Sequence, residues 1–214
     1  MKTKNKTILI TAGPTREYID PVRYISNGSS GKMGYSIADA AKKTGARVIL
    51  ISGPVSIKPP KNIKPVNVIS AADMLKAAKK YFSNCDAFIS CAAVSDYRPE
   101  KFTKSKIKKS GKPASLKLVP NPDILLTLSN SISRSAVRRP VLCGFALETE
   151  NLIENALLKL KKKNLDIIVA NGPESMESGT TSGALITKKG VRHFNRISKK
   201  RLARLLIGKI LPLI

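Results

Sequence analysis

Short apolar runs alternate along the chain with segments in which apolar residues recur every three or four positions. The apolar runs have the length of buried strands and lie at 7–11, 47–52, 65–69, 86–91, 140–145 and 166–170. The segments with helical periodicity lie at 31–44, 71–82, 149–163 and 197–211. Strands that are apolar along nearly all of their length and are separated by helices predict a parallel sheet covered on both faces, a doubly wound, Rossmann-like α/β fold.

Two segments depart from this alternation. Residues 97–121 are polar and basic, so we expect a flap there, with an extra strand at 115–119. Residues 184–187 and 191–195 flank a short Lys-Lys-Gly turn and predict a C-terminal hairpin. Because no repeat or low-complexity tract interrupts the chain, we expect residues 1–214 to form a single domain.

The composition is that of a globular protein with a substantial core. The chain has 214 residues, of which 42% are hydrophobic and 25% charged. No stretch approaches the roughly 18 apolar residues that span a bilayer, so a transmembrane protein is excluded. The apolar run after the basic N-terminus is too short for a signal peptide, so a cytoplasmic location is expected.

The net charge is unusual. Lys and Arg number 39 and Asp and Glu 14, which gives a formal charge of +25. Such an excess attracts polyanions, so nucleic acid and phosphorylated small molecules are both candidate partners. Aromatic residues are only 5% and tryptophan is absent, which argues against a stacking platform for single-stranded nucleic acid. Lysine-rich solvated faces are the third explanation of the charge.

Cysteine and histidine offer little chemistry. Cys85, Cys91 and Cys143 are widely spaced, and His193 is the single histidine. A zinc site built from Cys and His needs closer pairs, so that class of site is excluded. Any Ser-His or Cys-His catalysis would have to use His193, which lies in a strand-like segment near the C-terminus.

Candidate ligand-binding residues gather where strands end, because doubly wound sheets bind ligands beyond the carboxyl ends of their strands. A glycine-rich loop at 28–34 opens a helix, and its N–H groups and hydroxyls suit a phosphate. It matches neither a Walker loop nor GxGxxG, which disfavours an NAD(P)-dependent enzyme. Asp96 follows another strand and suits ribose hydroxyls, whereas Lys106 suits a polyphosphate or belongs to an exposed charge run.

Seven sequence blocks are specific enough to compare with a known family. They are ITAGPTRE at 10–17, DPVRYISNGSSGKMG at 20–34, AAVSDYRP at 92–99, KIKK at 106–109, NPDIL at 121–125, GFALET at 144–149 and KNLD at 163–166. In this order they resemble phosphopantothenoylcysteine synthetase of the bacterial, CTP-dependent type. That synthetase is often fused behind a flavin-dependent decarboxylase. This chain begins at the synthetase's first strand, so we expect a stand-alone enzyme with a separate decarboxylase partner, or else an excised domain.

The resemblance implies a two-step ligation in coenzyme A biosynthesis. The carboxylate of 4′-phosphopantothenate attacks the α-phosphate of CTP, which releases pyrophosphate and leaves an acyl cytidylate. The amine of L-cysteine then displaces CMP. The substrate carboxylate is the nucleophile, so the site has only to neutralise a triphosphate and align the reactants. ATP in place of CTP, and a basic nucleic-acid-binding module, remain alternatives.

The resemblance also implies residue roles. Asn27 is expected to act in turnover of the acyl cytidylate, Arg23 on phosphopantothenate and the second step, and Lys106 on the phosphates. Mg²⁺ is expected to bridge the triphosphate, with no metal ligand from the protein. The implied nucleotide-binding residues are Gly13, Ser29, Ser30, Gly31, Ser90, Cys91, Ala92, Ala93, Asp96, Pro122, Asp123, Ile124, Leu125, Phe145, Lys159 and Lys163.

The family is homodimeric, and the sequence offers a physical reason to expect a homodimer here. A short strand at 115–119 would have unpaired edges that a second subunit could satisfy. Two positions depart from the family pattern. Gly28 stands where the family usually has histidine, and the loop Ser178–Gly183 lacks the usual acidic or asparagine residues. No role is assigned to that loop.

Overall fold

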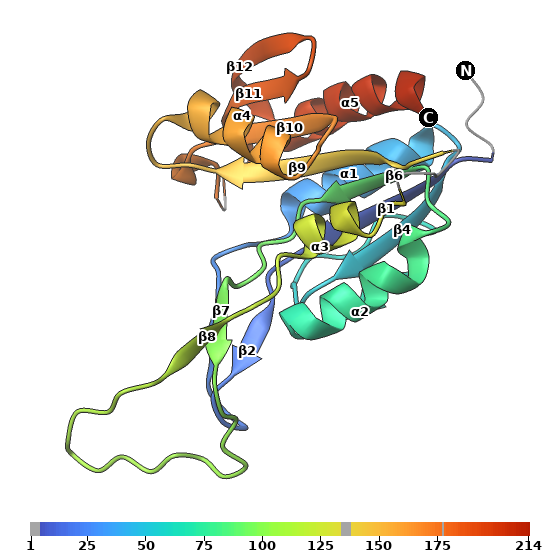
Figure 1. The fold of residues 1–214 in the computed structure, drawn as a ribbon. Coiled ribbons are helices and arrows are strands. Elements are labelled where there is room, and N and C mark those ends of the chain that lie inside the picture. The colour runs from blue at the N-terminus through green and yellow to red at the C-terminus, as the bar shows by residue number, and fades with distance from the viewer. Residues whose placement is uncertain (1–4, 134–137, 177) are drawn as a thin grey trace.

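The computed structural model describes residues 5–133, 138–176 and 178–214 and is built on an eight-stranded sheet (Figure 1). The strands of this sheet are β1 (Thr7–Ala12), β4 (Arg47–Ser52), β5 (Val66–Asn67), β6 (Ala87–Ser90), β9 (Val141–Leu147), β10 (Ile167–Asn171), β11 (Thr180–Thr187) and β12 (Gly190–Ser198). Their order across the sheet is β12-β11-β10-β9-β6-β1-β4-β5. From β10 to β5 all neighbours are parallel, and β11 and β12 join as an antiparallel hairpin.

Helices cover both faces of the sheet. One face carries α1 (Lys32–Lys43) and α5 (Lys199–Ile210), and the other carries α2 (Ala71–Phe82), α3 (Ile124–Asn130) and α4 (Leu152–Lys162). Side chains of β1 alternate between the two cores, with Ile8 and Ile10 toward α1 and α5 and Leu9 toward the opposite helices. Burial on both sides explains why the strands are apolar throughout. The predicted doubly wound, Rossmann-like fold is confirmed.

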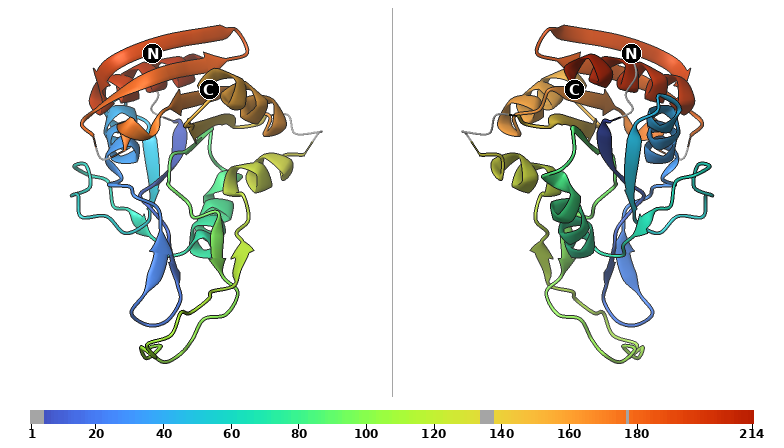
Figure 2. Two further views of the ribbon diagram at one scale, coloured as in Figure 1. Left: turned by 90° about the vertical axis from the view of Figure 1, so that its left-hand side faces the viewer. Right: turned by 90° about the vertical axis from the view of Figure 1, so that its right-hand side faces the viewer.

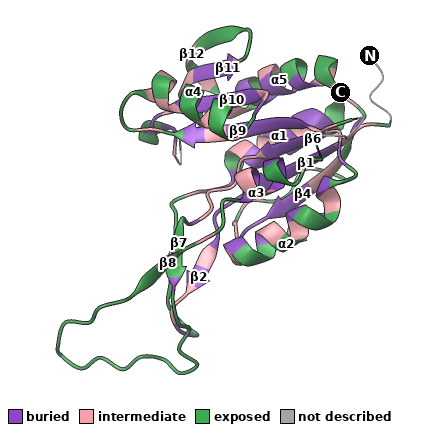
Figure 3. Ribbon diagram, viewed as in Figure 1, coloured by how far each residue is buried: buried purple, intermediate pink, exposed green. Residues whose placement is uncertain are grey.

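Two narrow ribbons extend from the same end of the molecule (Figure 2). One is the hairpin of β2 (Arg16–Tyr18) and β3 (Tyr24–Ser26), and the other pairs β7 (Tyr97–Pro99) with β8 (Leu118–Pro120). The loop between β7 and β8 is the predicted flap, and it is exposed along nearly all of its length (Figure 3). The strand predicted at 115–119 is observed only at Leu118–Pro120, because only these residues pair with β7.

Several helices and strands begin or end at other residues than the sequence pattern predicts. The helix predicted from residue 149 begins at Leu152, after Asn151, whose backbone is left-handed and whose side chain forms no capping hydrogen bond. The helix predicted from residue 197 begins at Lys199, because Ser198 caps α5 by accepting the Arg201 N–H. The strand predicted at 65–69 shrinks to β5. Helix α3 was not predicted, since it has only seven residues, and Asp123 caps it by accepting the Leu126 N–H.

Two helical glycines give a matched test of the packing. A Cβ at Gly34 would lie 2.5 Å from the Cβ of Ala12, where α1 packs on β1, whereas a Cβ at Gly208 in α5 has nothing within 4 Å. We expect Gly34→Ala to lower the free energy of unfolding by about 1–3 kcal/mol through overpacking. Gly208→Ala should raise it by about 0.5–1 kcal/mol through helix propensity. Urea denaturation measures both, and shifts of the same sign would contradict this packing.

Candidate functional site

Hydrogen bonds fix the loops after β1 and β6 to each other. The Ala93 N–H donates to the Gly13 carbonyl at 2.9 Å, and the Thr15 N–H donates to the Ala93 carbonyl at 3.3 Å. The hydroxyl of Thr11 accepts from the Ala92 N–H at 3.4 Å. Because β1 and β6 are adjacent at the point where the strand order reverses, these loops form the edge at which doubly wound folds bind ligands.

A cavity of about 180 Å³ opens at this edge. Its floor is the glycine loop 28–34 and the segment 91–93, and its far wall comes from β9, β10, β11 and α5. The structure therefore brings together seven of the predicted nucleotide-binding residues, which are Ser29, Ser30, Gly31, Cys91, Ala92, Ala93 and Phe145. Gly13 lies beside Gly31, and Ser90 ends β6 in register with Thr11 of β1.

Glycine is required at two points of this edge. Gly13 and Gly31 both have φ of +74°, and a Cβ on Gly31 would lie 2.8 Å from Cγ1 of Val55. Gly31 is also the N-cap of α1 and supplies no side-chain cap. The first N–H groups of α1 therefore have no capping side chain at the cavity floor, which is the arrangement that binds anions at helix N-termini.

Sequence reasoning did not single out several residues that line the cavity, among them Lys32, Asn171 and Lys199. Lys32 lies within the block at 20–34, and no role was predicted for it there. Asn171 ends β10 and Lys199 begins α5, so their approach to the glycine loop depends on tertiary packing. Partial burial lowers the pKa of Lys199, and repulsion from Lys32 acts in the same direction, whereas nearby Cys91 opposes it.

Asn27 lies between the glycine loop and the loop after β6. Its Nδ2 donates to the Val94 carbonyl at 2.9 Å. The preceding residue, Ser26, is fixed in turn by a hydrogen bond from its hydroxyl to the Thr15 carbonyl at 2.7 Å. These two contacts orient the Asn27 amide beside Val94, which directly follows the cavity segment 91–93.

A second set of predicted residues gathers around the start of α3. The Asn121 N–H donates to the backbone carbonyl of Asp96 at 2.7 Å. Because Pro122 follows Asn121, this bond holds the exposed Asp96 close to the start of α3. Lys163 pairs with Asp123 at 2.6 Å. In α4, Lys159 pairs with Glu148 at 2.5 Å. Both of these predicted nucleotide-binding lysines are thus ion-paired.

The two sets of predicted nucleotide-binding residues lie on opposite faces of the sheet. Ile124 and Leu125 are buried in the core beneath α2, α3 and α4, whereas Phe145 packs on the side of α1 and α5. A single nucleotide that contacts both sets would therefore have to cross the carboxyl ends of the central strands.

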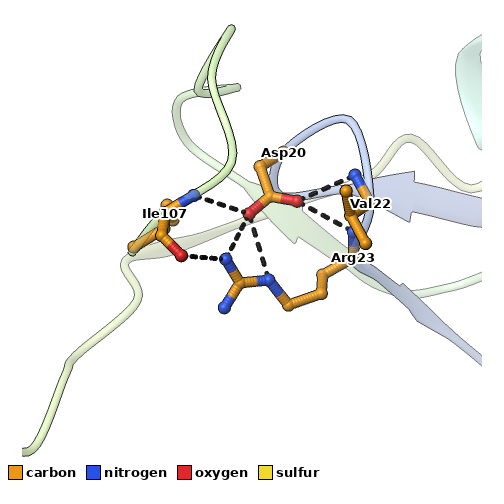
Figure 4. A network of polar contacts seen from close by, with 4 residues as sticks. All are labelled: Asp20, Val22, Arg23 and Ile107. Atoms are coloured by element: carbon orange, nitrogen blue, oxygen red, sulfur yellow. Dashed lines mark hydrogen bonds and ion pairs between the residues drawn. The ribbon is translucent and has the colours of Figure 1, made fainter. Parts of the chain in front are cut away.

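Arg23 and Lys106 belong to a third group, where the β2–β3 hairpin meets the flap: Figure 4 shows Arg23 beside Ile107, the residue that follows Lys106. Arg23 donates from Nη2 to Asp20 Oδ2 and to the Ile107 carbonyl, both at 2.6 Å. Asp20 also accepts the N–H groups of Val22, Arg23 and Ile107. The network ties the flap to the β2–β3 hairpin and places the exposed Lys106 next to an anchored residue.

The same contacts determine the protonation of Asp20, whose side chain is fully buried. Burial by itself would raise the pKa of Asp20, but the N–H groups of Val22, Arg23 and Ile107, together with the Arg23 guanidinium, hold that pKa well below its usual range. Because the folded-state pKa is depressed, the anchor is present above the ordinary carboxyl pKa and is lost as pH falls toward the lower folded-state value.

Asp20→Asn is expected to loosen the flap. Loss of the charge removes charge-assisted hydrogen bonds, so amide hydrogen exchange of Ile107 and its neighbours in the flap should speed up by roughly tenfold at neutral pH. Glu100→Gln is the matched control, because it removes the exposed Glu100–Lys117 ion pair of the flap without touching the anchor. Equal exchange rates in Asp20→Asn and wild type would show that the network does not hold the flap.

Other chemistry is sparse in the described part of the chain. Burial raises the pKa of Cys85 and Cys91 to about 12, so both thiols are protonated at neutral pH. No group of three or more His, Cys, Asp or Glu residues is placed to hold a metal ion among the residues described. Over the same residues, no helix has the length and apolar character needed to cross a membrane.

The fold and the cavity together define a Rossmann-like α/β domain whose ligand edge suits a phosphate-bearing compound. The chain belongs to the family of the DNA/pantothenate metabolism flavoprotein C-terminal domain, whose model matches residues 3–213. This assignment agrees with the family that the sequence blocks resemble, and the matching part of CoaBC is its C-terminal, synthetase part.

Individual relatives show which proteins of the family this chain is similar to. It is 46% identical over 207 residues to the coenzyme A biosynthesis bifunctional protein CoaBC of Haemophilus influenzae, covering 95% of this chain and 51% of that protein. The chain thus spans about half the length of such curated relatives. A crystal structure of the C-terminal domain of CoaBC superimposes with a TM-score of 0.82 at 40% identity, covering 98% of this chain and 95% of that one.

A more distant structure shares the fold. A Cab2 mutant in complex with phosphopantothenate-cysteine has a TM-score of 0.80 at 18% identity, covering 98% of this chain and 86% of that one.

Proposed function

We propose that this chain is a ligase that joins 4′-phosphopantothenate to L-cysteine, with CTP as the activating nucleotide. The observation that carries the proposal is the cavity at the ends of β1 and β6, lined by the glycine loop and by Lys32 and Lys199, in a chain homologous to the C-terminal part of CoaBC. The product named for the Cab2 complex, phosphopantothenate-cysteine, supports the same substrates.

In the first step, a carboxylate oxygen of phosphopantothenate attacks the α-phosphorus of CTP. The bond from that phosphorus to the bridging oxygen breaks, and pyrophosphate leaves with the electron pair. Because the substrate carboxylate is the nucleophile, this step requires no nucleophile from the protein. Its contribution is charge neutralisation by Lys106 of the flap and by the cavity, with Mg²⁺ arriving as the CTP·Mg²⁺ substrate.

In the second step, the cysteine amine attacks the acyl carbon, the bond to the CMP oxygen breaks, and the amine loses a proton. Negative charge builds on the acyl oxygen, and Asn27 is suited to receive it. One Nδ2 proton of Asn27 is used by the Val94 carbonyl, which orients the amide. The other proton remains available for the acyl oxygen.

Arg23 is expected to hold phosphopantothenate from the flap side. Its Nε and Nη2 atoms are engaged by Asp20 and by the Ile107 carbonyl. A guanidinium carries five N–H donors in a fixed plane, so the Nη1 edge remains for an anionic substrate while the buried Asp20 sets its direction.

The test is a titration of CTP and of ATP against fixed phosphopantothenate and cysteine, with pyrophosphate release as the readout. We expect saturable release with CTP that requires both other substrates, and a much lower kcat/KM with ATP. Comparable kcat/KM values would keep the ligase and remove the CTP assignment. No release with either nucleotide would contradict the ligase proposal itself.

The charge distribution gives the nucleic-acid alternative a specific observation. Residues 178–214 contain nine Lys and Arg residues and no Asp or Glu. Thermal shifts with duplex DNA across a salt series separate the two functions. Stabilisation that disappears by roughly 200 mM salt is generic electrostatics, whereas a shift with CTP·Mg²⁺ that persists at that salt marks a specific site.

A homodimer is also expected, although the physical reason has changed. The edge of β8 is paired with β7, so a lone strand with two free edges does not exist there. Exposed apolar side chains instead gather on the flap and the adjoining hairpin. They are Val22, Tyr24, Tyr97, Phe102, Ile107, Leu116 and Leu118. A second copy would cover them, and because two chains of +25 repel, the dimer should weaken at low salt.

Sedimentation velocity at several salt concentrations checks the dimer. Phe102→Asp on the flap should shift the population to monomer, because a charge would enter the apolar contact. Leu158→Asp is the matched control, since Leu158 is equally exposed apolar surface on α4, away from the flap. Wild type that is monomeric at every salt concentration would reject the assembly.

A further inference from the structure

A groove lies between the C-terminal part of α5 and the β11–β12 hairpin, which Figure 1 shows side by side. Its volume is about 620 Å³, against about 180 Å³ for the cavity at the ends of β1 and β6. The groove reaches Ile167, the first residue of β10, so it opens at the edge of the sheet where the parallel strands begin. A molecule bound there would leave the candidate active site uncovered, because that cavity opens at the opposite edge.

The rim of this groove carries positive charge that no acidic group neutralises. Its exposed cations are Lys188, Lys189, Arg192, Arg204 and Lys209. Within the described ranges, none of the five forms an ion pair. Asp166 is the single acidic residue among the described residues that line the groove, and Arg139 and the Leu142 N–H already engage its carboxylate. Like charges gathered on one rim repel each other, so an occupant that brings several anionic groups would be stabilised there.

The floor of the groove is apolar. Leu205, Pro212 and Leu213 contribute to it, and the side chain of Leu213 is 52% exposed. These residues lie outside the buried stripe of α5, in which residues such as Leu206 and Ile210 pack on the sheet. An apolar centre inside a charged rim is the arrangement of a protein interface, and it suits a segment that carries both acidic and apolar side chains.

Gly208 keeps this floor open. It lies in the last turn of α5, although glycine is less favourable to a helix than alanine. A Cβ at this position would meet no packing partner within 4 Å, so no close contact requires glycine there. The structural effect of Gly208 is that no side chain projects from this turn into the groove.

Three other occupants fit less well. A second copy of the chain offers little negative charge, because Lys and Arg outnumber Asp and Glu by 39 to 14. The phosphate backbone of a nucleic acid would neutralise the rim but leave the apolar floor uncovered. A flat membrane surface would touch the rim, whereas the floor of a concave groove is withdrawn from it.

We propose that this basic groove, formed by the five rim cations and the apolar floor around Gly208, docks an acidic peptide segment of another protein. The apolar side chains of the segment lie over Gly208 and its carboxylates pair with the rim. Docking at this edge of the sheet does not depend on ligase activity, and a partner held here leaves the substrate cavity accessible.

Fluorescence anisotropy with a labelled peptide of alternating Glu and Leu tests the groove. In an extended chain of this kind, Leu lies on one face and Glu on the other. We expect saturable binding to the wild-type chain, with an affinity that falls as salt is raised, because the rim charges are exposed. A peptide of the same length made of Glu alone should bind roughly tenfold more weakly or worse, since it has no apolar side chains to bury on the floor.

Gly208→Leu places a bulky side chain in the groove without changing the charge of the protein. Leucine favours the helix, so the variant should fold, and peptide affinity should fall by roughly tenfold or more because the leucine occupies the peptide's place. Gly208→Ala is the matched control and should bind within about threefold of wild type, since a methyl group leaves most of the groove open.

A second pair of variants tests the rim. Arg192→Gln combined with Arg204→Gln should weaken the peptide by roughly threefold to tenfold, the scale of two exposed ion pairs. Lys200→Gln combined with Arg201→Gln is the charge-matched control, because both residues are exposed in the first turn of α5 and neither lines the groove. This control should bind as wild type does.

Peptide affinity that is unchanged in Gly208→Leu, or reduced equally in the charge-matched control, would overturn the proposal, because the attraction would then be general to the charged surface. Absence of saturable binding by the alternating peptide would overturn it as well. Duplex DNA or phosphatidylglycerol vesicles could instead bind more tightly than the peptide and lose affinity in Gly208→Leu. That result would assign the groove to a nucleic acid or a membrane and reject the acidic segment.

Discussion

Asn27→Asp is expected to stop amide formation while the acyl cytidylate still forms. The Nδ2 proton offered to the acyl oxygen is replaced by a carboxylate, which repels the charge that develops there. The same carboxylate would face the Val94 carbonyl, to which the amide now donates. Loss of one donor to a developing oxyanion costs roughly 100- to 1000-fold in rate. The second step should fall by that amount, and the first step should be nearly unchanged.

Quenched reactions analysed by mass spectrometry measure both steps of this variant. We expect enzyme-bound acyl cytidylate to accumulate to about one equivalent, with pyrophosphate released in a single burst. Asn84→Asp is the matched control, because Asn84 is an exposed turn residue after α2, and it should behave as wild type. Normal product formation by Asn27→Asp would remove Asn27 from the mechanism.

Lys106→Gln is expected to reduce CTP-dependent turnover by roughly 100-fold, the scale of one lost charge-stabilising donor. The loss should fall on kcat more than on KM, because the lysine is expected to neutralise charge as pyrophosphate departs. In the structure Lys106 is exposed, and its neighbour Ile107 is tied to Asp20 and Arg23, so the flap presents it from an anchored point.

Lys112→Gln is the matched control for Lys106→Gln. Lys112 is an exposed flap lysine outside the family blocks, and its loss should leave turnover within about twofold of wild type, as expected for a solvated surface charge. If Lys106→Gln and Lys112→Gln give the same rates, Lys106 is an ordinary member of the charge run and phosphate neutralisation must come from elsewhere in the site.

The central sheet could be predicted because its signal is local. A strand such as β1 is buried on both faces, so every residue from Ile8 to Ala12 is buried, and in the sequence this is a nearly continuous apolar run with Thr11 as its one polar residue. The glycines after β1 and before α1 could be recognised in the same way, since Gly13 and Gly31 adopt a backbone conformation that disfavours other residues. These features require no knowledge of distant residues.

The elements that were missed depend on distant partners. Strands β2 and β3 have only three residues each and pair with each other outside the main sheet. Helix α3 has too few residues for a periodicity to emerge, and the capping role of its Asp123 was not predicted. Lys199 reaches the cavity only because α5 packs beside α1, a contact between opposite ends of the chain that no local pattern encodes.

The most direct test of the proposed chemistry follows the oxygen atoms. With ¹⁸O in the carboxylate of 4′-phosphopantothenate, attack on the α-phosphate of CTP places one labelled oxygen in the bond that later breaks beside the acyl carbon. That atom leaves with CMP, so the predicted result is one ¹⁸O in CMP and none in pyrophosphate for each amide formed. Label in pyrophosphate or orthophosphate, or unlabelled CMP beside the amide product, would contradict an acyl-cytidylate ligase.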